Sequence, residues 1–346
     1  MTRYFFVLSI FISLILYRQI QAEKTPPRKI ILLEQAKQIS EHAIKKASKS
    51  ESELNEDGGY NANISVIDCF AAMEYCYTGG QYVNQPIKFR MLMPDKIQPD
   101  KKYPLILWLH GSGESGDDNK RQLAHMQSAI ETIAGKNKQD FFMIATQCPY
   151  NTDWSHSVSN EGKGDAPLTI AVEILDAVIQ EYPIDTNKLG TLGFCSGGSA
   201  AWNVVSKYPG RFASMAAFST SPPANPHNFK QTAIWAFNNK DDSIPWKPME
   251  QFINSINAAG GNAYVTLKEY GGHNTWKNAL QTENVLDWAI LQDLKKIGYP
   301  AGIVIYHRTA GQTTLLFGLP ILILLLLQII SVVSKNSKHD FKKNDE

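Results

Sequence analysis

Short apolar segments alternate with segments of helical period along the middle of the chain, from about Val83 onward. Continuous apolar runs such as Leu105–Leu109 suit strands that are covered on both faces of a sheet. The predicted strands are Ile87–Met93, Tyr103–His110, Phe141–Thr146, Lys188–Phe194, Ala213–Phe218, Ala233–Asn238 and Ala263–Glu269. The predicted helices between them are Lys120–Ile133, Leu168–Tyr182, Ser196–Tyr208, Pro248–Ala259 and Trp276–Lys296. This alternation predicts an α/β domain over residues 83–300, with helices on both faces of a mainly parallel sheet.

Residues 23–82, which precede this pattern, do not show the same alternation of apolar segments and segments of helical period. Leu33–Ala47 has the spacing of an amphipathic helix, and Ser48–Asn61 is polar and contains glycine, as linkers do. We therefore expect a helical extension and a linker ahead of the sheet. Asn63-Ile64-Ser65 is an N-glycosylation sequon, which has meaning only in a host that glycosylates.

Two apolar blocks lie at opposite ends of the chain. The first, Phe5–Tyr17, follows Arg3 and precedes Ala22. A basic start, an apolar middle and a small residue at the cut are the layout of a secretory signal peptide, here residues 1–22. An uncleaved membrane anchor is the alternative interpretation of this block.

The second block, Leu315–Val333, would reach about 28 Å as a helix, close to the roughly 30 Å hydrocarbon core of a bilayer. Lysines follow it within residues 334–346, and basic residues after a span favour the cytoplasmic side. We expect a single-pass type I membrane protein whose catalytic domain is extracellular, periplasmic or lumenal. Residues 301–314 would be a juxtamembrane linker and 334–346 a cytoplasmic tail. A buried core helix is the alternative.

Composition excludes several classes of protein. The 346 residues contain 34 Lys plus Arg and 33 Asp plus Glu, so a net charge of +1 gives no basis for nucleic-acid binding. Charged residues make up 19% and apolar residues 43%, which excludes a disordered chain. The pair Cys69 and Cys76 either forms a disulfide in an oxidising compartment or stays as two reduced thiols. No metal-binding motif is present, and we expect neither a metal nor a cofactor.

The stretch Gly193-Phe194-Cys195-Ser196-Gly197-Gly198 joins a predicted strand to a predicted helix. This is the context of a nucleophile elbow, G-x-Nuc-x-G, with Cys195 in the nucleophile's position. Such an elbow holds its central residue in strained backbone geometry, and glycines beside it avoid clashes. Ser196 is an alternative nucleophile, but that frame would put Phe194 where the first glycine belongs.

Two later loops offer partners for a nucleophile. Asp241 and Asp242 follow the strand that ends at Asn238, and His273 follows the strand that ends at Glu269. Nucleophile, acid and histidine in this chain order are typical of the α/β-hydrolase catalytic triad.

An early glycine-rich loop, Gly111-Ser112-Gly113, follows another predicted strand. An oxyanion hole needs backbone N–H groups that meet at one point, and we expect them from Ser196 and from Ser112, with Gly111 next. Glu114, Trp154 and His156 are candidates for substrate binding on nearby loops, with a structural place as the alternative. Cys148 is expected to be a packed thiol.

On these motifs, the segment from about Lys88 to Leu294 resembles the secreted esterase and predicted-peptidase branch of the α/β-hydrolases. That branch is close to polyhydroxybutyrate depolymerases, feruloyl esterases and phospholipase/carboxylesterases. The matching stretches are Phe89–Pro94, Lys102–Asn119, Gln147–Pro149, the elbow, and the loops of Asp241 and His273. The resemblance implies Asp241 rather than Asp242 as the acid, because the branch places the acid four residues before a proline, here Pro245. Most of the branch has serine at the elbow, whereas the cysteine elbow is similar to that of dienelactone hydrolases.

A thiol has an unperturbed pKa of about 8.5, and an ion pair with His273 raises its thiolate fraction. Because a thiolate leaves more easily than an alkoxide, we expect small or polymeric esters, lactones or thioesters as substrates of a Cys195–His273–Asp241 triad. The alternatives are a catalytically silent cell-surface binding protein, in which the cysteine has quenched activity, and a peptidase.

Overall fold

The computed structural model describes residues 30–36, 64–79, 82–135, 140–150, 152–155, 165–281 and 284–296. All of them belong to the unit formed by residues 1–302. The predicted signal peptide, the juxtamembrane linker, the span at 315–333, the tail and His156 lie outside the described residues. In the part that is described, no helix has both the length and the apolar character needed to cross a membrane.

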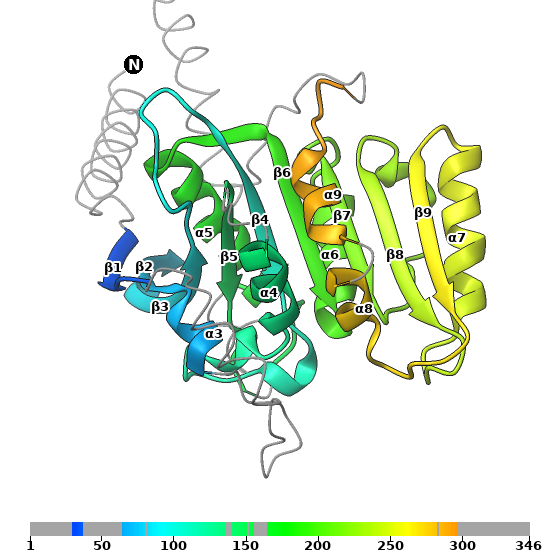
Figure 1. Cartoon of the computed structure of the whole chain (residues 1–346), viewed down its shortest axis with the longest axis horizontal. Coiled ribbons are helices and arrows are strands. Elements are labelled where there is room, and N and C mark those ends of the chain that lie inside the picture. Colours follow the sequence, from blue (N-terminus) through cyan, green and yellow to red (C-terminus); the bar gives the residue numbers. More distant parts are fainter. Residues whose placement is uncertain are drawn as a thin grey trace, which may run out of the picture. The chain divides into compact units, whose positions relative to one another are not determined.

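The described strands form one sheet in the order β1-β2-β3-β5-β4-β6-β7-β8-β9 (Figure 1). Their bounds are β1 Ile30–Glu34, β2 Ala71–Gly79, β3 Tyr82–Leu92, β4 Tyr103–Leu109, β5 Phe142–Thr146, β6 Ile184–Phe194, β7 Ser214–Phe218, β8 Ala233–Asn239 and β9 Asn262–Lys268. The six strands β5, β4, β6, β7, β8 and β9 are parallel to one another in the sheet. The remaining pairings, β1 with β2, β2 with β3 and β3 with β5, are antiparallel. The prediction of a mainly parallel sheet is therefore confirmed.

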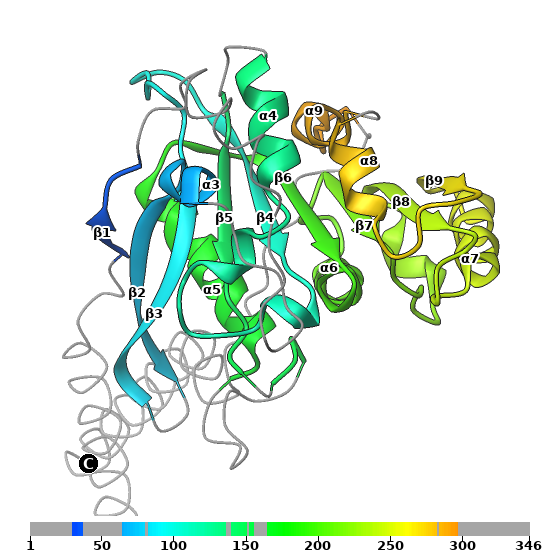
Figure 2. The ribbon, with the colours of Figure 1, turned by 60° about the horizontal axis from the view of Figure 1, so that its bottom comes forward.

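Helices cover both faces of this sheet (Figure 2). Their bounds are α3 Ile64–Asp68, α4 Gln127–Gly135, α5 Pro167–Glu181, α6 Ser196–Lys207, α7 Trp246–Ala258, α8 Thr275–Gln281 and α9 Val285–Leu291. A hydrophobic core lies on each face of the sheet, and alternate residues of β4 contribute to the two cores. Leu105 and Leu107 pack with α5, α6 and α7. Ile106 and Trp108 pack with α4, α8 and α9 on the other face. Side chains on a strand alternate between its faces, which explains why this strand is apolar throughout.

The N-terminal strands β1 and β2 were not predicted. The predicted helix at Leu33–Ala47 is wrong at its start, where Leu33 and Glu34 belong to β1, and residues 37–47 lie outside the description. In β2 the polar atoms of two buried tyrosines are satisfied, because Tyr77 Oη donates to Asp165 at 2.6 Å and Tyr75 Oη to Glu173 at 3.3 Å. Sequence pattern does not reveal such partners, which come from residues about ninety positions away.

Two predicted helices are shorter or broken. The helix predicted at Trp276–Lys296 is interrupted, because Asn284 has a left-handed conformation with φ 52° at the start of α9. The helix predicted at Lys120–Ile133 begins with a separate 3-10 turn, η2 at Arg121–Leu123, before α4.

All four cysteines are free thiols, so Cys69 and Cys76 are not bonded to each other in this structure. Cys148 is buried in the core, which confirms it as a packed thiol, and burial raises its pKa to about 11.

Candidate active site

Cys195 occupies a tight turn between the end of β6 and the start of α6. Its φ of 54° and ψ of −117° are strained for a residue with a side chain, and its N–H donates to the Phe218 carbonyl at 2.9 Å. The turn admits only glycine at its flanks: a Cβ on Gly193 would lie 2.1 Å from the Gly197 carbonyl oxygen. This is the predicted elbow geometry, with the half-buried thiol at the carboxyl edge of the sheet.

His273 lies beside Cys195 in the loop between β9 and α8. The hydrogen bond with the Cys195 side chain and the contact with Asp242 raise the pKa of His273 to about 9, against the opposing effect of burial. The ring therefore favours its protonated form at neutral pH. Nδ1 is taken by a carboxylate, which leaves Nε2 as the ring atom that serves Cys195.

The carboxylate that contacts the imidazole is Asp242, and the prediction of Asp241 for this place is wrong. Both Asp242 oxygens lie 3.0 Å from Nδ1 of His273, and the Asp242 side chain is fully buried. Burial would raise the pKa of Asp242, but hydrogen bonds from the Ile244 amide and His273 hold it below its usual value. Asp242 is therefore an ionised partner that fixes the imidazole with its proton on Nδ1.

Asp241 instead binds the backbone that carries the histidine. Its carboxylate accepts the N–H groups of Gly271 at 3.1 Å and Gly272 at 2.9 Å. Asn239 donates to the Gly272 carbonyl at 2.8 Å, so side chains hold both sides of this peptide segment. Positive φ values of 139° at Gly271 and 54° at Gly272 explain why two glycines precede His273.

Ser219, at the end of β7, was not predicted as a site residue. Its Oγ donates to the His273 carbonyl at 3.1 Å, lies 2.8 Å from the Thr275 hydroxyl and helps to lower the pKa of Asp242. It is fully buried and has φ 48°, a second strained residue beside the elbow. Strained residues gather at functional sites, but a sequence gives no sign of φ at a serine.

The predicted oxyanion donors come from two neighbouring segments. Ser112 begins a 3-10 turn, η1 (Ser112–Glu114), directly after Gly111, and Ser196 is the first residue of α6. An N–H group in the first turn of a helix has no acceptor within that helix. A Cβ on Gly197 would lie only 2.0 Å from the Leu109 carbonyl oxygen, so the start of α6 packs directly against the end of β4. This contact brings the two donor segments together.

The backbone of this loop is held by buried side chains. His110 Nδ1 donates to the Gly111 carbonyl at 2.6 Å, while its Nε2 accepts the N–H of Cys148 at 2.8 Å. Burial lowers the pKa of His110 to about 4, so the ring is neutral and carries its proton on Nδ1. Trp154 Nε1 donates to the His110 carbonyl at 3.0 Å.

The structure places two of the candidate substrate-binding residues in the interior. Trp154 is 4% exposed and Glu114 is 2% exposed, where it pairs with His125. Neither lines the mouth of a site, so the structural alternative holds for both. His156 lies outside the described residues.

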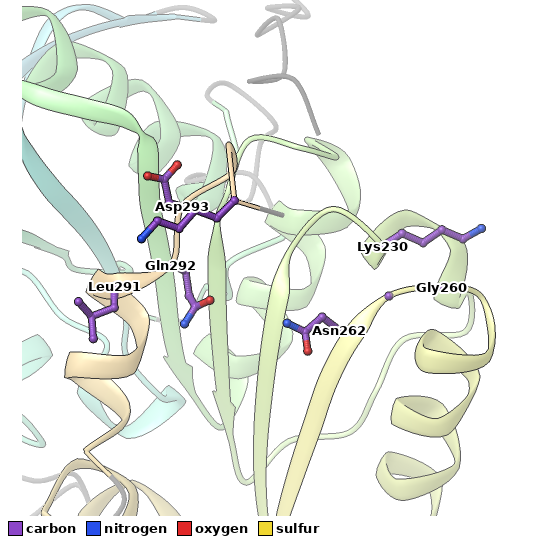
Figure 3. A pocket seen from close by; sticks show the side chains of 8 residues that line it. Lys230, Gly260, Asn262, Leu291, Gln292 and Asp293 are labelled. Carbon is purple, nitrogen blue, oxygen red and sulfur yellow. The ribbon is translucent and has the colours of Figure 1, made fainter. Parts of the chain in front are cut away.

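A cavity of about 360 Å³ lies elsewhere, between the end of α9 and the start of β9 (Figure 3). Its lining includes Lys230, Asn262, Gln292 and Asp293. It is at the amino end of β9, whereas Cys195 and His273 follow the carboxyl ends of their strands. Within the described ranges, no group of three or more His, Cys, Asp or Glu is arranged to hold a metal ion.

Comparison with known proteins gives a family and a fold. Residues 80–285 match the Esterase family, which is described as "Putative esterase". The structure is similar to that of a thermostable esterase, with 24% identity, a TM-score of 0.58 and coverage of 70% of each chain. It is also similar to a ferulic acid esterase, with 16% identity, a TM-score of 0.50 and coverage of 64% of this chain and 96% of that one. At these identities the likeness shows the fold. No curated protein matches the chain.

Proposed function

This chain belongs to the Esterase family of the α/β-hydrolases, and we propose that it cleaves carboxylic esters, lactones or thioesters through a Cys195–His273–Asp242 triad. One observation supports this most. The His273 ring bonds Asp242 through Nδ1 and interacts with the Cys195 side chain, so three residues from separate loops are linked in the order that acyl transfer requires.

The first half of the proposed reaction acylates the enzyme. The Cys195 thiolate attacks the carbonyl carbon, and the carbonyl electron pair moves to oxygen. The N–H groups of Ser112 and Ser196 stabilise this oxyanion, one such donor being worth about 3–4 kcal/mol. When the intermediate collapses, the C–O bond to the alcohol breaks, and protonated His273 gives its proton to the departing oxygen.

The second half releases the acid. Neutral His273 removes a proton from water, and the resulting hydroxide attacks the acyl carbon of the thioester. Collapse breaks the C–S bond, which returns the thiolate beside a protonated imidazole. Asp242 keeps the same ring orientation through both halves and stays ionised.

Turnover of short p-nitrophenyl esters by the full chain tests this proposal. The Cys195→Ala variant should lose all turnover, whereas Cys148→Ala, which removes a buried thiol outside the triad, should retain it. A thioester on Cys195 should be trapped by acid quench and found by mass spectrometry. Full activity of the Cys195→Ala variant would exclude the thiol nucleophile. If wild type gives no turnover and Cys195→Ser creates it, the silent binding protein becomes the better interpretation.

We further propose that the catalytic domain is exported and anchored by residues 315–333. The support is the sequence alone: an apolar block near each end, with lysines after the second. The full chain should remain in the membrane pellet after alkaline carbonate extraction, and a chain ending before residue 315 should be released. Recovery of both chains in the same soluble fraction would contradict the anchor.

A further inference from the structure

A buried acid–histidine pair lies behind the oxyanion loop and takes no part in the proposed triad. Glu114 Oε1 is 3.1 Å from Nε2 of His125, and the two side chains are 2% and 3% exposed. Removing a carboxylate from water is costly, and a hydrogen bond from a buried partner repays the cost only in good geometry. A pair of this kind contributes little net free energy to folding. Its main effect is to hold the segments around it in place.

On one side the pair holds the oxyanion loop. Glu114 is the last residue of η1, and a Cβ added at Gly111 would lie 2.9 Å from Glu114 Oε2. Burial would raise the pKa of Glu114, but His125 and the nearby Gly111 N–H together hold it below its usual value. The carboxylate is therefore charged, and Nε2 of His125 carries the proton that lies between them.

On the other side the pair reaches the two remaining catalytic segments. The His125 ring lies 4.2 Å from Trp276, three residues after His273, and 5.0 Å from Phe194, which immediately precedes Cys195. Phe194 also lies 5.1 Å from the His273 ring and would touch any Cβ added at Gly111. One buried pair thus links the oxyanion loop, the elbow and the histidine loop.

We propose that Glu114 and His125 are positioning residues that fix the Ser112 amide relative to Cys195. This inference rests on the proposed function. The Glu114 side chain joins the end of η1 to His125, and the His125 ring packs against Phe194 and Trp276. If the oxyanion loop is displaced by as little as 1 Å, the rate of the reaction falls by about 100-fold, because the N–H donors no longer meet the oxyanion.

The test separates the oxyanion from the nucleophile. Glu114→Gln removes the charge with almost no change in volume, and Asp117→Asn, an exposed acid on the same loop, is the matched control. With p-nitrophenyl esters, Glu114→Gln should lower kcat by about 100-fold with little change in KM. Its affinity for an ester-like trifluoromethyl ketone, which forms an oxyanion adduct on Cys195, should fall by a similar factor. Alkylation of Cys195 by iodoacetamide forms no oxyanion and should keep its wild-type rate.

A second pair of variants guards against a folding defect at Glu114. His125→Gln keeps an N–H donor for the carboxylate and should retain more turnover than His125→Leu, although both change the ring packing. Unchanged kcat in Glu114→Gln would overturn the inference, as would a parallel loss of iodoacetamide reactivity, which would mean that the pair acts on the thiolate. If wild type itself shows neither turnover nor labelling of Cys195, the proposed function fails and this inference with it.

Discussion

The two adjacent aspartates that follow β8, Asp241 and Asp242, have different contacts. Asp242 points into the protein, where its buried carboxylate binds Nδ1 of His273. Asp241 is exposed and accepts two backbone N–H groups of the glycines before that histidine. One carboxylate therefore sets the tautomer of the ring, and the other sets the position of its loop.

Asparagine substitutions distinguish these roles. Asp242→Asn should lower kcat by about 10⁴-fold, because the amide stabilises the wrong tautomer and leaves an imidazolium unpaired. Asp241→Asn keeps one acceptor for the Gly271 and Gly272 amides, and we expect a much smaller loss, about tenfold. Steady-state kinetics on a p-nitrophenyl ester measures both. A larger loss of kcat in Asp241→Asn than in Asp242→Asn would mean that Asp241 is the acid of the triad.

The pH dependence of turnover follows from His273. Its pKa is raised to about 9 chiefly by the hydrogen bond with Cys195, so the ring is protonated at neutral pH and loses its proton as the pH rises through about 9. Turnover limited by acylation should fall in that range, because the general acid for the leaving alcohol is lost.

Nuclear magnetic resonance titration of the imidazole provides the direct measurement. In Cys195→Ala the largest cause of the shift is removed, so His273 should titrate at a clearly lower pH than in wild type. Identical titration curves for the two proteins would show that the sulfur does not interact with the ring.

At the scale of elements, the start of α6 must pack closely against the end of β4. A Cβ at Gly197 would lie 2.0 Å from the Leu109 carbonyl oxygen and 2.4 Å from that of His110, both backbone atoms that cannot move alone. Gly197→Ala should therefore destabilise the fold by about 3 kcal/mol and separate the oxyanion donors. Urea denaturation measures the loss, with Asn203→Ala on the exposed side of α6 as the control. A stable Gly197→Ala variant with normal turnover would contradict this close packing.

Elements that are defined by their own residues could be predicted from the sequence. Features that depend on contacts with residues far away in the chain could not. The apolar run of β4 and the glycines around Cys195 carry their own constraints, so their positions agree with the prediction. The choice between Asp241 and Asp242 depends on the direction in which a loop turns, and a spacing rule taken from a resemblance gives the wrong residue. Glu114 looks like a surface acid because its partner, His125, is not visible as such in the sequence.

At the scale of the whole molecule, the three residues of the proposed triad, and Ser219 which supports them, all follow carboxyl ends of parallel strands. Cys195 follows β6, Ser219 follows β7, Asp242 follows β8 and His273 follows β9, and these strands are neighbours in the sheet. Adjacent parallel strands bring their loops to one edge, which is where α/β proteins place their chemistry. The antiparallel strands β1 to β3 extend the opposite side of the sheet and supply none of these residues.

The free energy of unfolding of the whole domain should depend on a second buried pair, which is formed by Asp176 and Arg211. Asp176 of α5 accepts a hydrogen bond from Arg211, which follows α6, and so joins two helices on one face. Burial raises the pKa of Asp176 to about 6, although Arg211 opposes the rise. Because the folded state then binds a proton more tightly than the unfolded chain, the stabilisation is complete below about pH 4 and is lost as the pH rises through about 6.

The Asp176→Asn variant cannot titrate at this position, so the difference between its free energy of unfolding and that of wild type isolates this group. Wild type should lose stability relative to the variant between about pH 4 and pH 6, and the difference should be constant above about pH 7. Urea denaturation at closely spaced pH values measures it, with Asp95→Asn at an exposed position as the matched control. If wild type instead gains stability relative to Asp176→Asn over that interval, the attraction of Arg211 outweighs burial and the pair stabilises the ionised form.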